Sequence, residues 1–172
     1  TALEAAEGPG AKEWYFSLHT DGSGCDDLII EGGGFRDRFP EDPRKLFVRM
    51  NGSNIFNFTI KRVPTLIQDT LAAAGESMDG VDYFIFHQSN RFIMQHLAKK
   101  AAIPKQKIPL TIEEFGSAGG PSVPLTITRG LLERPAERAL RLLLISYGVG
   151  LSWASALIDL APAAVLDHIQ LS

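Results

Sequence analysis

The residues best suited to chemistry lie in two short motifs. The first is His87-Gln-Ser-Asn90, which follows the apolar run over residues 81–86. The second is the glycine-rich turn over residues 115–122, which contains Ser117. A neutral imidazole can donate a hydrogen bond to a substrate carbonyl or act as a base, and a serine hydroxyl can donate as well. If the two motifs converge in space, they form a site.

Both residues also have a purely structural interpretation. His87 could be satisfied by neighbouring backbone, although the end of a buried strand is a position that favours function. Ser117 could simply shape the turn or cap the following helix. As a nucleophile paired with His87 it is a poor candidate, because the strand-turn-helix pattern Gly-x-Ser-x-Gly is absent around it.

Two other features invite a chemical interpretation. The loop Tyr147-Gly-Val-Gly150 offers unhindered backbone N–H groups, as an oxyanion site requires, but a plain hairpin turn has the same composition. Cys25 precedes Asp26 and Asp27 in a glycine-rich stretch, and acidic neighbours disfavour the reactive thiolate. We therefore expect Cys25 to be incidental.

Composition excludes several classes of protein. With 172 residues, 45% of them hydrophobic and 22% charged, the chain has the makeup of an ordinary globular domain. The net charge of -3 gives no general attraction to nucleic acid, and no apolar run is long enough to span a membrane. The single cysteine and the lack of a basic, apolar start predict a reduced, cytoplasmic protein.

The spacing of the potential ligands predicts neither a metal site nor a nucleotide site. No group of His, Cys and Asp residues has the spacing of metal ligands. The turn over residues 116–120 lacks the lysine of a phosphate loop, and Gly148-Val-Gly150 leads into a strand instead of a helix. We therefore expect no metal and no bound cofactor.

Periodicity predicts alternating strands and helices. Strands are expected over residues 12–20, 46–50, 81–86, 107–112, 139–146 and 151–157, and helices over 54–74, 91–102 and 121–131. This order predicts an α/β fold in which a layered, mixed five-stranded sheet carries helices on its faces and ends in an antiparallel strand. We expect one domain over residues 12–160, with 1–11 as a linker or fragment end and 161–172 as a tail.

Three ordered motifs carry a resemblance to a known family. His87-Gln-Ser-Asn90, the segment 115–124 and the segment 146–157 resemble the C-terminal half of β-ketoacyl-acyl-carrier-protein synthase III. That family shows a His-Gln-Ala-Asn corner, a Phe/His-Gly-Asn turn and a Phe-Gly-Gly-Gly-x-x-Trp-Gly-Ser-Ala ending. The segment 50–56 also resembles the family's approach to its long central helix, so the likeness runs over residues 14–160.

The resemblance implies a thiolase-like fold, of which this chain is one of two pseudo-equivalent halves. Family members move an acyl group from coenzyme A onto a cysteine and then condense it with malonyl on acyl carrier protein, releasing carbon dioxide. His87 matches the catalytic histidine, which donates to the malonyl thioester carbonyl. Val149 would supply the N–H of the oxyanion hole. Acyl-coenzyme A is a substrate here, and no cofactor is implied.

The resemblance also implies binding surfaces and partners. Positions that line the pantetheine tunnel of the family are matched by Gly52, Phe56 and Asn90. The basic patch that meets the acidic carrier protein is matched by Arg91, Lys99 and Lys100. The implied partners are an N-terminal half that carries the nucleophilic cysteine, the acyl carrier protein, and a second copy of the full protein in a homodimer.

Two departures from the family pattern leave several functions open. The nucleophilic cysteine belongs to the other half, and Cys25 does not match it. Ser117 stands where the family has its catalytic Asn, and a hydroxyl is shorter than a carboxamide, so it needs a water to reach the same atom. The chain is then half of a condensing enzyme that is inactive alone, a non-catalytic partner subunit, or an acyltransferase or thioesterase variant.

Overall fold

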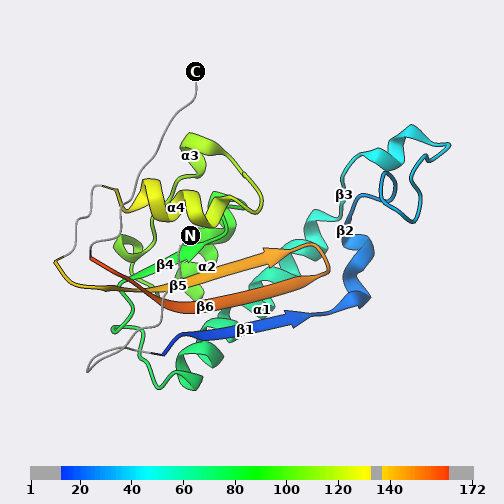
Figure 1. Cartoon of the computed structure of the whole chain (residues 1–172). Coiled ribbons are helices and arrows are strands. Elements are labelled where there is room, and N and C mark those ends of the chain that lie inside the picture. The colour runs from blue at the N-terminus through cyan, green and yellow to red at the C-terminus, as the bar shows by residue number, and fades with distance from the viewer. Residues whose placement is uncertain (1–12, 133–136, 163–172) are drawn as a thin grey trace.

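The computed structural model describes residues 13–132 and 137–162 (Figure 1). The expected linker over residues 1–11 lies outside the described residues, and so does the expected tail apart from residues 161 and 162. No helix within the described ranges is long and apolar enough to cross a membrane.

The main sheet has four strands in the order β1-β6-β5-β4 (Figure 1). Its strands are β1 (Tyr15–Thr20), β4 (Tyr83–Phe86), β5 (Leu140–Gly148) and β6 (Ser152–Leu160). β4 and β5 are parallel, whereas β6 is antiparallel to both β5 and β1. The α/β class, the mixed sheet and the antiparallel last strand are confirmed. The sheet contains four strands of the described chain instead of the expected five.

Strands β4 and β5 are buried because both of their faces carry apolar side chains. Phe84 and Phe86 point into a core layer that also contains Leu143 and Ile145. Ile85 packs in a second, smaller layer on the opposite face. Such near-continuous apolar runs are typical of parallel strands that are covered on both sides.

Helices cover the two faces of the sheet. α1 (Gly52–Ala73) and α2 (Arg91–Lys100) contribute Val63, Leu66 and Leu97 to the larger core layer. α4 (Ser122–Gly130) packs on the other face. These apolar residues recur at helical spacing, which is why each helix buries one stripe.

The ends of α1 follow from local capping. The Asn51 side chain accepts a hydrogen bond from the Asn54 N–H at 3.2 Å, so Asn51 is the N-cap of this helix. Gly75 has a φ of 60°, and the Glu76 N–H donates to the Leu71 carbonyl at 2.9 Å. This arrangement ends the helix and requires the left-handed conformation that glycine adopts readily.

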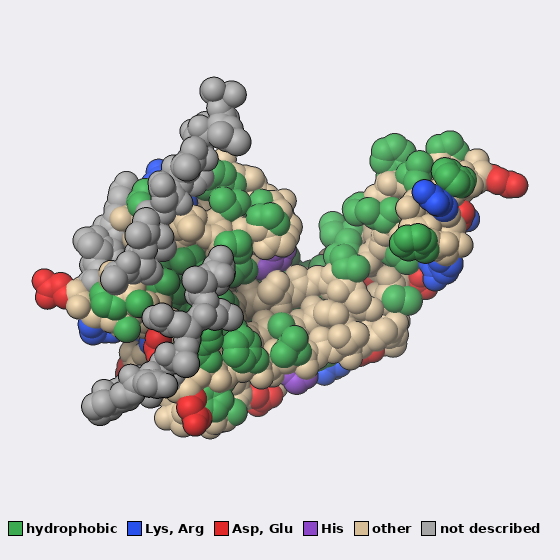
Figure 2. Space-filling view, in the orientation of Figure 1, with side chains coloured by type: hydrophobic (Ala, Val, Ile, Leu, Met, Phe, Trp, Pro, Cys, Tyr) green, Lys and Arg blue, Asp and Glu red, His purple; other side chains and the backbone are tan. Residues whose placement is uncertain are grey.

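A separate arm projects from the body of the molecule (Figures 1 and 2). It contains the short 3-10 helices η1 (Gly22–Asp27) and η2 (Pro43–Leu46) and a small sheet of β2 (Leu28–Ile29) and β3 (Arg49–Met50). The strand expected over 46–50 shrinks to β3, which pairs with β2 instead of joining the main sheet.

The strand expected over residues 107–112 is wrong. This stretch contains the end of η3 (Lys105–Lys107), an extended link and the start of α3 (Ile112–Phe115). Pro109 has no N–H to give to a sheet neighbour. The Thr111 N–H instead donates to the Gln88 side chain at 3.0 Å, and the Lys107 ammonium binds the Val81 carbonyl at 2.6 Å. Hydrogen bonds that involve side chains therefore fix this segment, in place of the backbone ladder of the expected strand.

Asp82 fixes the start of the β4–β5 pair and gives a test of its stability. Its carboxylate accepts hydrogen bonds from the Arg141 N–H at 2.7 Å and from the Arg138 guanidinium at 2.9 Å. The Arg138 hydrogen bond is the main reason why the pKa of Asp82 lies below its usual value. We expect Asp82→Asn to lower the free energy of unfolding at pH 7 by about 1–2 kcal/mol in urea titrations.

The pH dependence of this loss follows from the lowered pKa. A carboxyl whose pKa is lower in the folded state stabilises the fold above its unfolded pKa of about 3.9, and this contribution disappears as the pH falls through the folded value. The difference between wild type and variant should therefore close in strong acid. Asp69→Asn, an exposed change on α1, serves as the control. A constant difference down to low pH would contradict this account.

Candidate functional site

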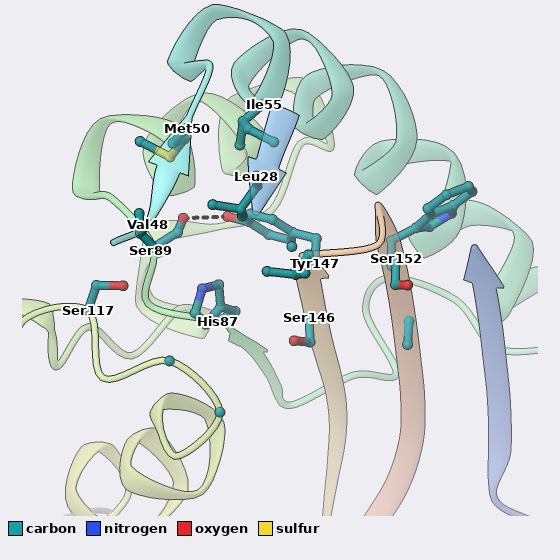
Figure 3. A pocket seen from close by; sticks show the side chains of 16 residues that line it. Leu28, Val48, Met50, Ile55, His87, Ser89, Ser117, Ser146, Tyr147 and Ser152 are labelled. Atoms are coloured by element: carbon teal, nitrogen blue, oxygen red, sulfur yellow. Dashed lines mark hydrogen bonds between the residues drawn. The ribbon is translucent and has the colours of Figure 1, made fainter. Parts of the chain in front are cut away.

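A cavity of about 810 Å³ lies between the arm and the carboxyl ends of β4 and β5 (Figures 2 and 3). The arm and the start of α1 contribute an apolar wall that includes Leu28, Val48, Met50 and Ile55. His87 lies on the opposite side, where β4 has just ended. Open α/β folds place ligand sites at this edge of the sheet.

The backbone and the ring of His87 are both anchored. Its N–H donates to the Ile145 carbonyl at 2.7 Å, which extends the β4–β5 pairing by one residue. Its Nδ1 is 2.7 Å from the Ser122 hydroxyl oxygen. Burial lowers the pKa of His87 below the usual value, and a hydrogen bond with the Gly119 backbone opposes this effect. The imidazole is therefore neutral near pH 7, as a donor or a base requires.

Ser122 ties the two chemical motifs together. It is the first residue of α4, and its hydroxyl oxygen also accepts a hydrogen bond from the Gln88 N–H at 3.4 Å. The His87 corner and the glycine-rich turn therefore converge, which is the condition for the two motifs to form one site. The sequence alone does not reveal the role of Ser122, because nothing in the pattern shows which residue after the turn will reach the imidazole.

Ser117 lies on the turn between α3 and α4 and lines the same cavity. Figure 3 shows it beside His87 with its hydroxyl turned into the open space. Gly116 and Gly119 in this turn have φ values of 64° and 68°, which other residues adopt only with strain. The two glycines therefore allow the turn to bring Ser117 to the cavity.

Val149 is the third predicted catalytic residue at the cavity. It lies in the tight turn between β5 and β6, and 67% of its surface is exposed. Within the described residues, its N–H has no hydrogen-bond partner. An unpaired N–H at a cavity wall is available to a developing oxyanion.

The hydroxyl groups of Ser89 and Tyr147 also lie at the cavity, and the sequence did not predict a functional role for either. The Ser89 and Tyr147 hydroxyl oxygens lie 2.8 Å apart, and the Tyr147 ring meets the His87 ring edge-on, with centroids 5.6 Å apart. Burial raises the pKa of Tyr147 to about 12. Their proximity could have been found from the parallel pairing of β4 with β5, since residues that follow Phe86 then lie beside those that follow Ile145.

The residues expected to line a pantetheine tunnel do not line this cavity. Gly52 begins α1, and Phe56 stacks on Phe92 with ring centroids 6.2 Å apart. The Asn90 side chain caps α2 by accepting a hydrogen bond from the Phe92 N–H at 2.8 Å. Met50, close to Gly52 in the chain, does line the cavity. The tunnel role of Gly52, Phe56 and Asn90 remains a prediction.

The residues of the expected docking patch lie on α2. Arg91 forms an ion pair with Glu113. The Lys100 ammonium donates to the Ile60 carbonyl at 2.7 Å, and Lys99 is exposed. Cys25 is exposed on η1 and does not line the cavity. Among the described residues, no group of three or more His, Cys, Asp or Glu side chains could hold a metal ion.

The structure has a mixed sheet with helices on both faces, and a histidine at a strand end and two glycine turns surround one cavity. These features define one half of a thiolase-like fold. Residues 71–160 match the family model for the 3-oxoacyl-[acyl-carrier-protein (ACP)] synthase III C terminal. The chain therefore belongs to the β-ketoacyl-acyl-carrier-protein synthase III family. This confirms the resemblance inferred from the three motifs.

Individual relatives support the same assignment. The structure of a 3-oxoacyl-(acyl-carrier protein) synthase from Burkholderia xenovorans LB400 is 39% identical, with a TM-score of 0.84 over 93% of this chain and 48% of that one. The β-ketoacyl-[acyl-carrier-protein] synthase III of Mesorhizobium japonicum is 31% identical over 161 residues, which are 91% of this chain and 48% of that protein. The chain thus spans about half the length of the relatives that it resembles.

The lowered pKa of His87 gives a direct test of the site. Since burial disfavours the charged imidazole, we expect the His87 ring to titrate with a midpoint below the usual value of about 6.5. Two-dimensional NMR of the ring protons measures this midpoint, and a His87→Gln variant assigns the signal. Because the pKa of His87 is lower in the folded state than in the unfolded state, protonation favours unfolding. His87 therefore reduces the free energy of unfolding as the pH falls below about 6.5. A midpoint at or above 6.5 would contradict the neutral imidazole.

Proposed function

We propose that this chain is the C-terminal half of a synthase III-like condensing enzyme and that it has no turnover alone. The complete enzyme would carry out a decarboxylative Claisen condensation between an acyl thioester and malonyl-acyl carrier protein, in fatty acid biosynthesis. The observation that carries this proposal is the meeting of His87, Ser117 and the Val149 N–H at one cavity.

In this reaction, the bond between the malonyl carboxylate and the α-carbon breaks, and carbon dioxide leaves. The electron pair stays with the α-carbon as an enolate whose charge lies largely on the thioester oxygen. His87 donates a hydrogen bond to that oxygen and so stabilises the charge as it develops. Its depressed pKa suits this role, because a neutral imidazole can donate without giving up its proton.

The enolate carbon then attacks the acyl thioester on the cysteine of the other half. The carbonyl oxygen becomes an oxyanion, which the Val149 N–H stabilises, and the cysteine thiolate leaves when the carbonyl re-forms. In the complete enzyme, with the other half and the substrate in place, the apolar wall of Leu28, Val48 and Met50 would keep water away and lower the local dielectric constant. Hydrogen bonds to charged oxygens are stronger in such surroundings.

The proposal includes the substrates and partners of the complete enzyme. Acyl-coenzyme A supplies the acyl group, with Gly52, Phe56 and Asn90 along the pantetheine path and no cofactor. The acidic carrier protein docks at the basic patch of Arg91, Lys99 and Lys100. The complete protein, with the N-terminal half that carries the nucleophile, forms a homodimer in the cytoplasm.

We expect His87→Ala in the complete protein to reduce carbon dioxide release from malonyl-acyl carrier protein at least about 100-fold, because it removes a donor to the enolate. Ser117→Asn should raise release, up to about tenfold, because a carboxamide reaches further than a hydroxyl. Release of ¹⁴C-labelled carbon dioxide measures both changes. Thr128→Ala, a change on α4 at a half-buried position outside the cavity lining, is the control. Unchanged release in His87→Ala would rule out the assignment.

Ser117 favours a second candidate function. With a hydroxyl at the position of the family's Asn, the site retains the histidine but has a weaker donor for decarboxylation. An acyltransferase or thioesterase needs only the histidine and the oxyanion hole. Acyl transfer without carbon dioxide release would select this alternative. A coding sequence upstream of Thr1 without a nucleophilic cysteine would instead favour a non-catalytic partner subunit.

The sheet of this chain has an apolar face that fits a second half. Phe16 and Leu18 on β1 are 62% and 77% exposed, and together with Val123 and Leu144 they line a shallow pocket. A contiguous apolar surface of this kind marks an interaction site. We propose that the N-terminal half covers it in the complete protein.

The chain expressed alone should therefore associate and show no turnover. We expect concentration-dependent oligomers in sedimentation velocity, because water contact with the face is unfavourable. Phe16→Ser combined with Leu18→Ser should reduce this association. Phe92→Ser, which removes an equally exposed aromatic side chain from α2, should not. A monodisperse monomer of the unaltered chain over the whole concentration range would contradict the expectation.

A further inference from the structure

A pair of hydroxyl groups adjoins His87 in the cavity. The Ser89 and Tyr147 hydroxyl oxygens are 2.8 Å apart, and both residues line the cavity with His87. Figure 3 shows the pair on one side of the His87 ring and Ser117 on another. The mechanism proposed above uses neither hydroxyl of this pair.

One hydroxyl hydrogen of this pair is not used in the hydrogen bond between the two groups. Two hydroxyls carry two hydrogens, and only one lies between the two oxygens. Within the described residues, neither hydroxyl has a further hydrogen-bond partner. Tyr147 is 7% exposed, whereas Ser89 is only partly buried, so the uncommitted hydrogen is best placed on Ser89. A donor in a cavity is stabilised when a ligand oxygen accepts its hydrogen.

Tyr147 is rigid enough to orient this donor. It belongs to β5 and to the larger core layer, and its ring meets the His87 ring at an interplanar angle of 85°. A pKa of about 12 keeps the phenol protonated throughout the neutral pH range, so Tyr147 retains a hydrogen that it can donate to Ser89. Ser89 is fixed in turn because its own N–H donates to the His87 carbonyl at 2.9 Å.

We propose that the Ser89 hydroxyl, oriented by Tyr147, is a second hydrogen-bond donor to the thioester oxygen that His87 serves. This inference rests on the proposed function. When the carboxylate carbon leaves as carbon dioxide, the electron pair of the broken bond moves into the enolate and the charge reaches the thioester oxygen. Ser89 stabilises that charge without transferring a proton. Tyr147 acts through Ser89 and is a positioning residue.

Near-isosteric substitutions in the complete protein test the pair. Ser89→Ala removes the donor and Tyr147→Phe removes the group that orients it, while both keep the packing. We expect each change to lower kcat for carbon dioxide release about 10- to 100-fold with little change in KM. The double variant should lose no more than either single variant, because the two hydroxyls act as one unit. Ser89→Thr keeps a hydroxyl and should restore most of the activity.

Two further measurements separate this inference from a structural role and from the proposed function. The NMR midpoint of His87 should stay within the error of wild type in Ser89→Ala, since the packing around the ring is kept. Release within twofold of wild type in both single variants, or losses that multiply in the double variant, would overturn the role of the pair while leaving the proposed function intact. A wild-type protein that releases no carbon dioxide would overturn both.

Discussion

The site depends on the parallel pairing of β4 with β5. The hydrogen bond from the His87 N–H to the Ile145 carbonyl extends this pairing past the last residue of β4 and sets the height of the imidazole above the sheet. Tyr147, two residues beyond Ile145, then lies beside the ring, and the turn that follows presents the Val149 N–H. One register therefore positions a ring, a phenol and an unpaired backbone donor together.

Ser122 provides the second constraint, because it fixes the ring that the sheet has placed. Its hydroxyl contacts both the imidazole and the Gln88 N–H, so α4 is held against the strand end. The turn before α4 carries Ser117 and can reach the cavity because its glycines adopt positive φ values. Sheet and helix thus meet at the histidine, which explains why two distant motifs form one site.

The sequence predicts the parts of this site that have a local signature. A buried strand followed by His87, a glycine turn around Ser117 and a glycine loop around Val149 are each visible in a few neighbouring residues. The contacts of Ser122 with His87 and of Ser89 with Tyr147 join distant segments, so no local pattern reveals them. The strand expected over 107–112 failed for the same reason, since bonds from Lys107 and Thr111 to distant groups replace a strand ladder.

The two sides of the cavity belong to different parts of the fold, since the arm forms one wall and the main sheet carries the residues opposite. Leu28, Val48 and Met50 lie on the small sheet or just before it, whereas His87 is built on the main one. No hydrogen bond of the β4–β5 pair passes through these wall residues. Side chains on the wall can therefore change in size without disturbing the register that positions the imidazole. Such a division lets the shape of the wall change while His87 and the residues around it stay in place.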